Sequence, residues 1–217
     1  MVNFKKYFGI VLSVVLIAFF YSCSKEKEDN KISKNSIINK KNLAIDINES
    51  FINWTVRKTN GYHTGTLKIQ NGNLNLDNGL PVSGDCTIDM NSITVTDIKD
   101  SAENKKAIEF LKSKDMFDVE KYPIANMHIR IILPLKTAKM PNVNSTVKGN
   151  ITIKDTTSAT VFTAFTKYYE DKVVCKATFT LKSAIWNIPF SSVKFDKDSE
   201  KNPIKDDFEI ELYIVAK

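Results

Sequence analysis

Apolar residues occupy every second position along most of the chain after residue 60, and this alternation limits the folds that the chain can adopt. Successive side chains of a β-strand point to opposite faces, so a period of two indicates a strand with one buried face. In the first such segment His63, Gly65, Leu67 and Ile69 share one parity. The other alternating segments are residues 74–76, 82–90, 125–131, 147–153, 173–181 and 208–214, and residues 160–168 form a strand of mixed parity.

Turn and helix signals complete this pattern. Asn78-Gly79, followed by Pro81, is a turn of the hairpin type. An antiparallel sheet of about eight strands removes its exposed edges by closing on itself, so we predict an all-β fold with a single antiparallel eight-stranded barrel at residues 47–217. Residues 101–116 interrupt the alternation with apolar residues at helical spacing, which predicts one short helical insertion.

The N-terminal segment has the order of a secretory signal. Lys5 and Lys6 precede a mostly apolar run from Phe8 to Phe20, and Ser22-Cys23 follows. The run is shorter than the roughly 20 residues of a membrane-spanning helix, so we interpret residues 1–22 as a signal peptide of the lipoprotein type. Its removal would leave Cys23 as the acylated N-terminus, while a plain secreted protein is the alternative.

This interpretation places the protein in the cell envelope. The expected location is the outer membrane, with the acyl chains of Cys23 as the anchor and the domain facing the periplasm or the cell surface. Residues 23–46 are rich in Lys, Asn, Ser and Glu and are predicted to form a flexible tether. The sequence leaves open whether the protein forms a homodimer.

The distribution of charged residues and of histidines argues against several classes of function. The formal net charge is +6, and removal of residues 1–22 takes away two lysines and no acidic residue. The lysines are spread along the chain without a basic block, so no nucleic-acid partner is expected. The chain has two histidines, His63 and His128, and neither has a neighbouring Cys, His or Asp at metal-ligand spacing. We therefore expect no enzyme, no metal site and no cofactor.

Two further groups of residues are candidate sites. Asp85, Asp89 and Asp97 suggest a divalent cation, but the first two alternate as ordinary solvent-facing strand positions. Cys86 and Cys175 share the inward parity, and the sequence leaves open whether they pair in an oxidising compartment or remain free.

Several blocks of the sequence resemble the YceI-like family in the same order. They are residues 54–58 with His63-Thr64-Gly65, residues 88–93, residues 110–123 and residues 149–155, and the resemblance extends over residues 45–217. The resemblance implies an exported, lipocalin-like barrel of eight antiparallel strands that binds a long polyisoprenoid or a similar amphiphile and has no agreed catalytic residues.

A closed barrel of eight strands is either filled by its own side chains or holds one ligand. The small inward residues Gly65, Gly84, Gly149 and Ala177 are expected to leave unfilled volume. We predict a non-enzymatic protein that carries or sequesters a polyisoprenoid or an isoprenoid quinone; the alternative is a surface-anchored interaction module with a filled barrel. The predicted ligand-binding residues are Trp54, Val56, His63, Leu67, Ile69, Ile88, Met90, Met127, Ile129, Phe179, Trp186, Ile210 and Leu212.

Overall fold

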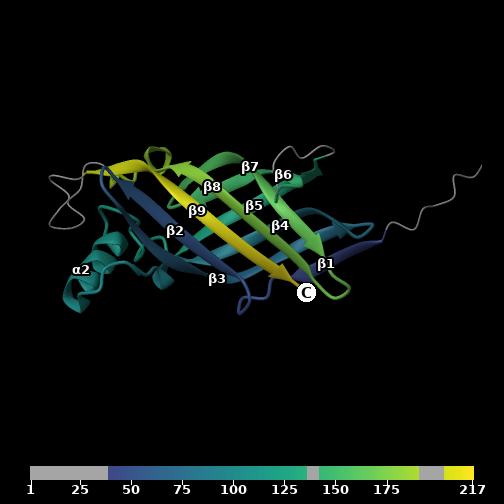
Figure 1. Cartoon of the computed structure of the whole chain (residues 1–217), viewed down its shortest axis with the longest axis horizontal. Coiled ribbons are helices and arrows are strands. Elements are labelled where there is room, and N and C mark those ends of the chain that lie inside the picture. Colours follow the sequence, from purple (N-terminus) through teal and green to yellow (C-terminus); the bar gives the residue numbers. More distant parts are fainter. Residues whose placement is uncertain (1–38, 136–141, 191–202) are drawn as a thin grey trace, which may run out of the picture. The chain divides into compact units, whose positions relative to one another are not determined.

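Antiparallel strands form a closed barrel in the computed structural model, which describes residues 39–135, 142–190 and 203–217 (Figure 1). The strands are β1 (Lys40–Ala44), β2 (Phe51–Lys58), β3 (Tyr62–Asp77), β4 (Leu80–Asp89), β5 (Ile124–Pro134), β6 (Ser145–Ile153), β7 (Thr156–Tyr168), β8 (Val173–Lys182) and β9 (Ile204–Ala216). The helical elements of the described residues are η1 (Met90–Ser92), α2 (Ser101–Lys112) and η2 (Ser183–Trp186).

Eight of the strands form the ring, in the order β2, β9, β8, β7, β6, β5, β4 and β3. The ring closes because β3 pairs with β2 through Trp54↔Gly65 and with β4 through Ile69↔Ile88. The predicted eight-stranded antiparallel barrel is thus confirmed. The predicted hairpin turn is confirmed too: Asn78 and Gly79 join β3 to β4 with φ of 50° and 81°, the left-handed conformation that a two-residue hairpin loop requires.

β1 and β2 lie end to end and together fill one position of the ring. β1 pairs with the second half of β3, as in Leu43↔Leu74, and β2 pairs with the first half. Residues 40–46, predicted from the sequence to be part of the tether, therefore belong to the barrel and its first turn. In β1 Leu43 alone is buried, which is too little alternation to predict a strand. Cys23 and the predicted signal peptide lie outside the described residues.

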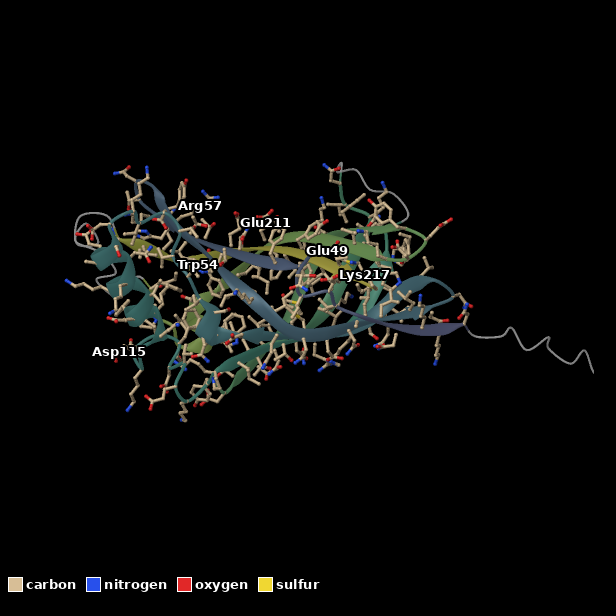
Figure 2. All side chains as sticks on the ribbon, turned by 90° about the horizontal axis from the view of Figure 1, so that it is seen from below. Glu49, Trp54, Arg57, Asp115, Glu211 and Lys217 are labelled. Carbon is tan, nitrogen blue, oxygen red and sulfur yellow. The ribbon has the colours of Figure 1, made fainter. Side chains whose placement is uncertain are left out.

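The turn between β1 and β2 is bound to β9 and the residue after it. The backbone N–H of Asp46 donates to the carbonyl oxygen of Val215 at 2.8 Å, and the N–H of Val215 donates to Ser50 Oγ at 2.9 Å. Lys217 Nζ lies 2.8 Å from Asp46 Oδ2 and 2.5 Å from Glu49 Oε1. Figure 2 labels Glu49 and Lys217. The hydrogen bonds from Lys217 are the main reason that the pKa values of both carboxyl groups lie below their usual range.

Two of the register shifts between neighbouring strands change which residues face the lumen. One lies between Ile69 and Asn71 in β3, and the other lies between Ile129 and Ile131 in β5. Ile131, assigned to the inward parity from the sequence, is consequently 41% exposed, whereas Ile132 is buried. A bulge inserts one extra residue, so every position after it changes face.

One end of the barrel is covered by the segment between β4 and β5, which includes α2 (Figure 1). Where β4 ends, the following residues continue along β3, since Thr96 N donates to Thr64 O at 2.8 Å. The Asp100 side chain then caps α2 by accepting from Glu103 N at 2.9 Å. The helix ends at Lys112, earlier than the predicted residue 116. In the described part of the chain, no helix has both the length and the apolar character needed to span a membrane.

Candidate functional site

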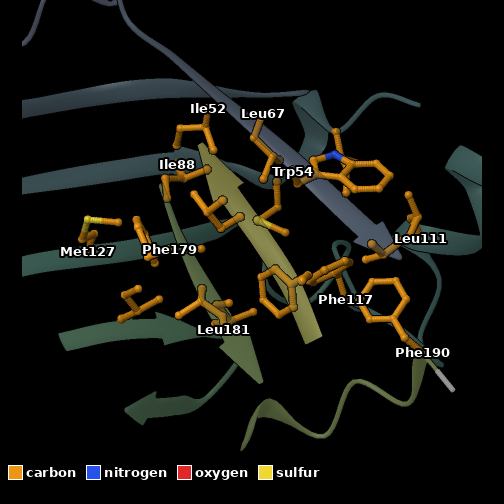
Figure 3. Close-up of a pocket in the computed structure, with 18 residues that line it drawn as sticks. Ile52, Trp54, Leu67, Ile88, Leu111, Phe117, Met127, Phe179, Leu181 and Phe190 are labelled. Carbon is orange, nitrogen blue, oxygen red and sulfur yellow. The ribbon is translucent and has the colours of Figure 1, made fainter. Parts of the chain in front are cut away.

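The lumen of the barrel contains two apolar cavities. The α2-side cavity has a volume of about 60 Å³ and is lined by strands together with Leu111 of α2 and Phe117 after it (Figure 3). The β1-side cavity has a volume of about 70 Å³ and is lined by Ile45, Leu74 and inward residues of β4 to β9. The side chains of the protein therefore fill much of the lumen and leave these two spaces.

Three side chains lie between the two cavities. Met127 of β5 lines both of them. Phe179 lines the α2-side cavity and stacks on Phe162, which lines the β1-side cavity, with ring centroids 4.2 Å apart and an interplanar angle of 12°. We call Met127, Phe162 and Phe179 the partition. Methionine has three rotatable bonds and repacks readily, so Met127 is the most adaptable member.

Cavity size sets a limit on what can bind without rearrangement. An engineered apolar cavity of about 150 Å³ holds one benzene molecule. The cavities of about 60 and 70 Å³ are each smaller than this. An apolar chain of several isoprene units therefore fits only if lining side chains move, and displacement of the partition would join the two spaces.

Most residues predicted from the sequence line these cavities. The α2-side cavity is lined by Trp54, Val56, Leu67, Ile88, Met90, Met127, Phe179 and Ile210. The β1-side cavity is lined by Met127, Ile129 and Leu212. His63, Ile69 and Trp186 line neither cavity, although all three are buried.

Polar contacts explain the positions of His63 and Trp186. His63 Nδ1 lies 2.7 Å from Asp97 Oδ2, and Asp97 Oδ1 accepts from Thr64 N at 2.9 Å. This contact fixes the segment after β4 against β3. Trp186 Nε1 donates to Thr156 O at 3.0 Å, which fixes η2 against β7. Both side chains hold the wall of the barrel together in the structure.

Sequence reasoning missed the lining residues that come from outside regular strands. Leu111, Phe117 and Phe190 line the α2-side cavity, and the rings of Phe117 and Phe190 meet edge to face with centroids 6.3 Å apart. These segments have no strand periodicity, so parity could not place them. The apolar pair Met116-Phe117 inside the family-like block was the available signal, since both residues are buried.

The inward glycines differ: Gly84 lines the β1-side cavity, as expected, whereas Gly65 and Gly149 line neither cavity. A Cβ atom added at Gly65, Gly84 or Gly149 would lie 1.8, 2.5 or 2.3 Å from a backbone carbonyl oxygen. Glycine is present at these positions because another backbone segment approaches closely. Ala177 also lines the β1-side cavity, as expected.

Cys86 and Cys175 are free and line the β1-side cavity. Burial raises the pKa of the Cys86 thiol to about 12 and that of Cys175 to about 11. His128 is exposed, as predicted, and its ring contacts Asp85. Within residues 39–135, 142–190 and 203–217, no three His, Cys, Asp or Glu side chains are grouped so that they could hold a metal ion.

The closed antiparallel barrel and its apolar interior define a lipocalin-like fold. Residues 43–216 match the YceI-like domain, so the chain belongs to the YceI-like family, which is a family of binding proteins.

Solved structures agree with this fold. BcnA of Burkholderia cenocepacia is similar with a TM-score of 0.63 and 20% identity, over 80% of this chain and 99% of BcnA. A polyisoprenoid-binding domain of Saccharophagus degradans, implicated in plant cell wall breakdown, is similar with a TM-score of 0.56 and 11% identity, over 81% of this chain and 97% of that domain. No curated protein matches the sequence.

Proposed function

We propose that the lumen binds the apolar tail of an isoprenoid-type lipid, a polyisoprenoid or an isoprenoid quinone, and that the protein carries or sequesters this lipid. The observation that carries the proposal is the pair of apolar cavities inside a closed barrel, with Met127 lining both of them. Membership of a family of binding proteins supports it, and so does the fold shared with the polyisoprenoid-binding domain of Saccharophagus degradans.

Burial of hydrocarbon supplies the affinity in this proposal. One isoprene unit has five carbons, so its burial is worth about 4 kcal/mol at roughly 0.8 kcal/mol per carbon. Two or three units would offset the cost of displacing the partition and of ordering the tail. Affinity should therefore rise over the first few units and then change little, because later units add ordering costs as well as contacts.

The same proposal assigns the protein a binding role without catalysis. His63, on the inward parity of β3, is engaged in a structural contact with Asp97. The two lumenal thiols, Cys86 and Cys175, have raised pKa values and are poor nucleophiles near neutral pH.

We also propose that Cys23 carries acyl chains that anchor the protein to the outer membrane. Two or three chains bind a bilayer stably, at roughly 0.8 kcal/mol per buried CH₂, whereas a single chain binds reversibly. Cys23→Ser should move the protein from the membrane fraction to the soluble fraction, while Cys86→Ser, at a buried lumenal position, should leave it in the membrane fraction. Undiminished membrane association of Cys23→Ser would refute the anchor.

The small cavity volumes favour one other function, an interaction module whose barrel stays filled. Organic extraction of the purified protein followed by mass spectrometry separates the two. A co-purifying isoprenoid supports the carrier, and repeated clean extracts from native membranes support the module. Ala177→Leu would fill the β1-side cavity and reduce the extracted lipid, whereas Ala159→Leu, at an exposed position of β7, would not.

A further inference from the structure

Part of the outer surface of the barrel is apolar. Ile131 and Leu133 of β5 and Val161 of β7 are 41%, 40% and 65% exposed, and Leu135, just after β5, is 36% exposed. Ile131 and Val161 both pair with Lys148 of β6, so the three side chains lie in one row on the outer face. We call Ile131, Leu133, Leu135 and Val161 the β5 rim. Neighbouring apolar side chains that are exposed together mark a contact surface.

The polar residues around the β5 rim favour an anionic partner. The row beside Ile131, Lys148 and Val161 contains Leu133, Thr146 and Thr163, so Lys148 is the only charged residue in the two rows. Its ammonium makes no ion pair with another described residue. Two copies of this face packed together would bring two such lysines close to each other, whereas anionic lipid head groups would supply the missing counter-charge.

The wall of the barrel is unpaired beside the β5 rim. The pairing of β4 with β5 stops at Gly84↔Ile129, and both of these residues line the β1-side cavity. Beyond this pair, the first residues of β4 pair with β3, and residues 131–134 of β5 pair with β6. We call this unpaired boundary the β4–β5 seam. It begins at the β1-side cavity and runs along the part of β5 that carries the rim.

The described chain begins at the same end of the barrel. The carbonyl oxygen of Asn39 accepts from Asn78 N at 3.0 Å, in the turn where β4 starts. Because β4 and β5 are antiparallel, β5 ends where β4 starts, at the end that contains β1 (Figure 1). Cys23 precedes Asn39 by 16 positions, which span at most about 55 Å. An acylated Cys23 would hold this end near a bilayer, where even a weak contact is favoured by the high local concentration.

We propose that the β5 rim docks the barrel onto the surface of a bilayer that contains anionic lipids. The inference rests on the proposed Cys23 anchor and lumenal site, and it adds the surface through which the barrel meets the membrane. The rim side chains enter the boundary between head groups and acyl chains, and Lys148 extends its ammonium to the phosphates. Docking brings the β4–β5 seam to the bilayer, so an apolar lipid reaches the β1-side cavity without crossing water.

Fluorescence quenching by lipid measures the docking. Leu133→Cys and Glu211→Cys are made separately in the full-length acylated protein and labelled with the fluorophore NBD. The raised pKa values of Cys86 and Cys175 keep these thiols unreactive near pH 7. In vesicles of phosphatidylethanolamine and phosphatidylglycerol, the label at residue 133 should shift its emission to the blue and be quenched by spin-labelled lipid. The label at residue 211 should stay in water, because β9 lies four strands from β5 in the ring and Glu211 is exposed.

Substitutions in the rim give the second measurement. Val161→Glu places a charge in the docked surface and should lower the ratio of docked to undocked label at residue 133 by about tenfold. Thr178→Glu, at an exposed position of β8, is the matched control and should leave the ratio unchanged. Lys148→Gln should lower it about fivefold on vesicles with phosphatidylglycerol and little on phosphatidylcholine alone.

Uptake of a ligand from the vesicles tests the seam. Farnesol, an isoprenoid alcohol of three units, is supplied in the vesicles as a fluorescent analogue. Uptake should be about tenfold slower for Val161→Glu than for Thr178→Glu, in proportion to the docked fraction. The affinity of the two variants for the analogue should be equal, because neither residue lines a lumenal cavity. Equal uptake rates would overturn passage through the seam.

The remaining outcomes separate this inference from the proposed function. An anchored protein whose label at residue 133 stays in water would overturn the docking and leave the anchor and the lumenal site intact. A shielded label that spin-labelled lipid does not quench, together with a doubled molecular mass, would show that a second copy covers the rim and would overturn the bilayer as its partner. Absence of the protein from the vesicle fraction would overturn both the anchor and the docking. Failure of the farnesol analogue to bind the natural protein would overturn the lumenal site.

Discussion

Met127 offers the most direct test of how the lumen accepts a ligand. Its side chain is 5% exposed and is the member of the partition that lines both cavities. Truncation of a buried methionine to alanine costs about 2–5 kcal/mol, partly from lost contacts and partly from the cavity left behind. We expect Met127→Ala to lower stability by about 3 kcal/mol, which for a domain of this size lowers Tm by roughly 6–12 °C.

The same change should improve ligand binding, because the two cavities would join. Farnesol then enters without displacing a side chain, so its affinity should rise about tenfold over the natural protein. Thermal unfolding followed by circular dichroism, with and without farnesol, measures both effects. A ligand at about 100 times its Kd stabilises by roughly 2.7 kcal/mol, which would restore most of the lost Tm.

Ile69→Ala is the matched control for this experiment. Ile69 is 3% exposed and lines neither cavity, so its truncation should cost a similar stability without raising the affinity for farnesol. Equal ligand-induced stabilisation of the two variants would show that Met127 does not separate the cavities, and the reasoning about the partition would fail.

Two other predictions concern titratable groups. The pKa values of Asp46 and Glu49 in the folded protein are lowered mainly by hydrogen bonds from Lys217. The two ionised carboxylates therefore stabilise the fold fully above the unfolded pKa of about 4, and this stabilisation is lost as the pH falls through their lower folded pKa values. Urea unfolding between about pH 7 and pH 2 should show this loss, and Lys217→Met should make it smaller; an unchanged pH profile would contradict the assignment. Burial raises the pKa of Cys86 to about 12 and that of Cys175 to about 11, so neither thiol should react with iodoacetamide in the native protein at about pH 8. Both thiols should react in urea. Rapid labelling of the native protein, detected by mass spectrometry, would argue against their burial.

The strands could be predicted well from the sequence, because a strand buried on one face has apolar and polar residues in alternation. This alternation identified the inward faces of β4, β8 and β9 and most of the cavity-lining residues on them. The bulge after Ile129 escaped this reasoning, because an extra residue has no signature of its own where consecutive residues are all apolar, as in residues 131–133. β1 escaped because a single buried leucine makes no pattern.

The candidate site was less predictable than the fold. Whether an inward residue reaches a cavity depends on the neighbours that cover it, so Ile69 is buried without lining a cavity. Leu111 and Phe190 reach the lumen from outside the strands, where parity carries no information.

The position of β9 between β2 and β8 has a consequence for synthesis. Asn53 Nδ2 of β2 donates a hydrogen bond to Glu211 Oε2 of β9, and 158 positions in the sequence separate the two residues. Ile45, which precedes β2, pairs with Ala216 of β9 through an isolated β-bridge. Contacts between such distant segments slow folding, and a nascent chain cannot complete its circle of strands before β9 has emerged from the ribosome. The barrel therefore closes only after nearly the whole chain has been synthesised.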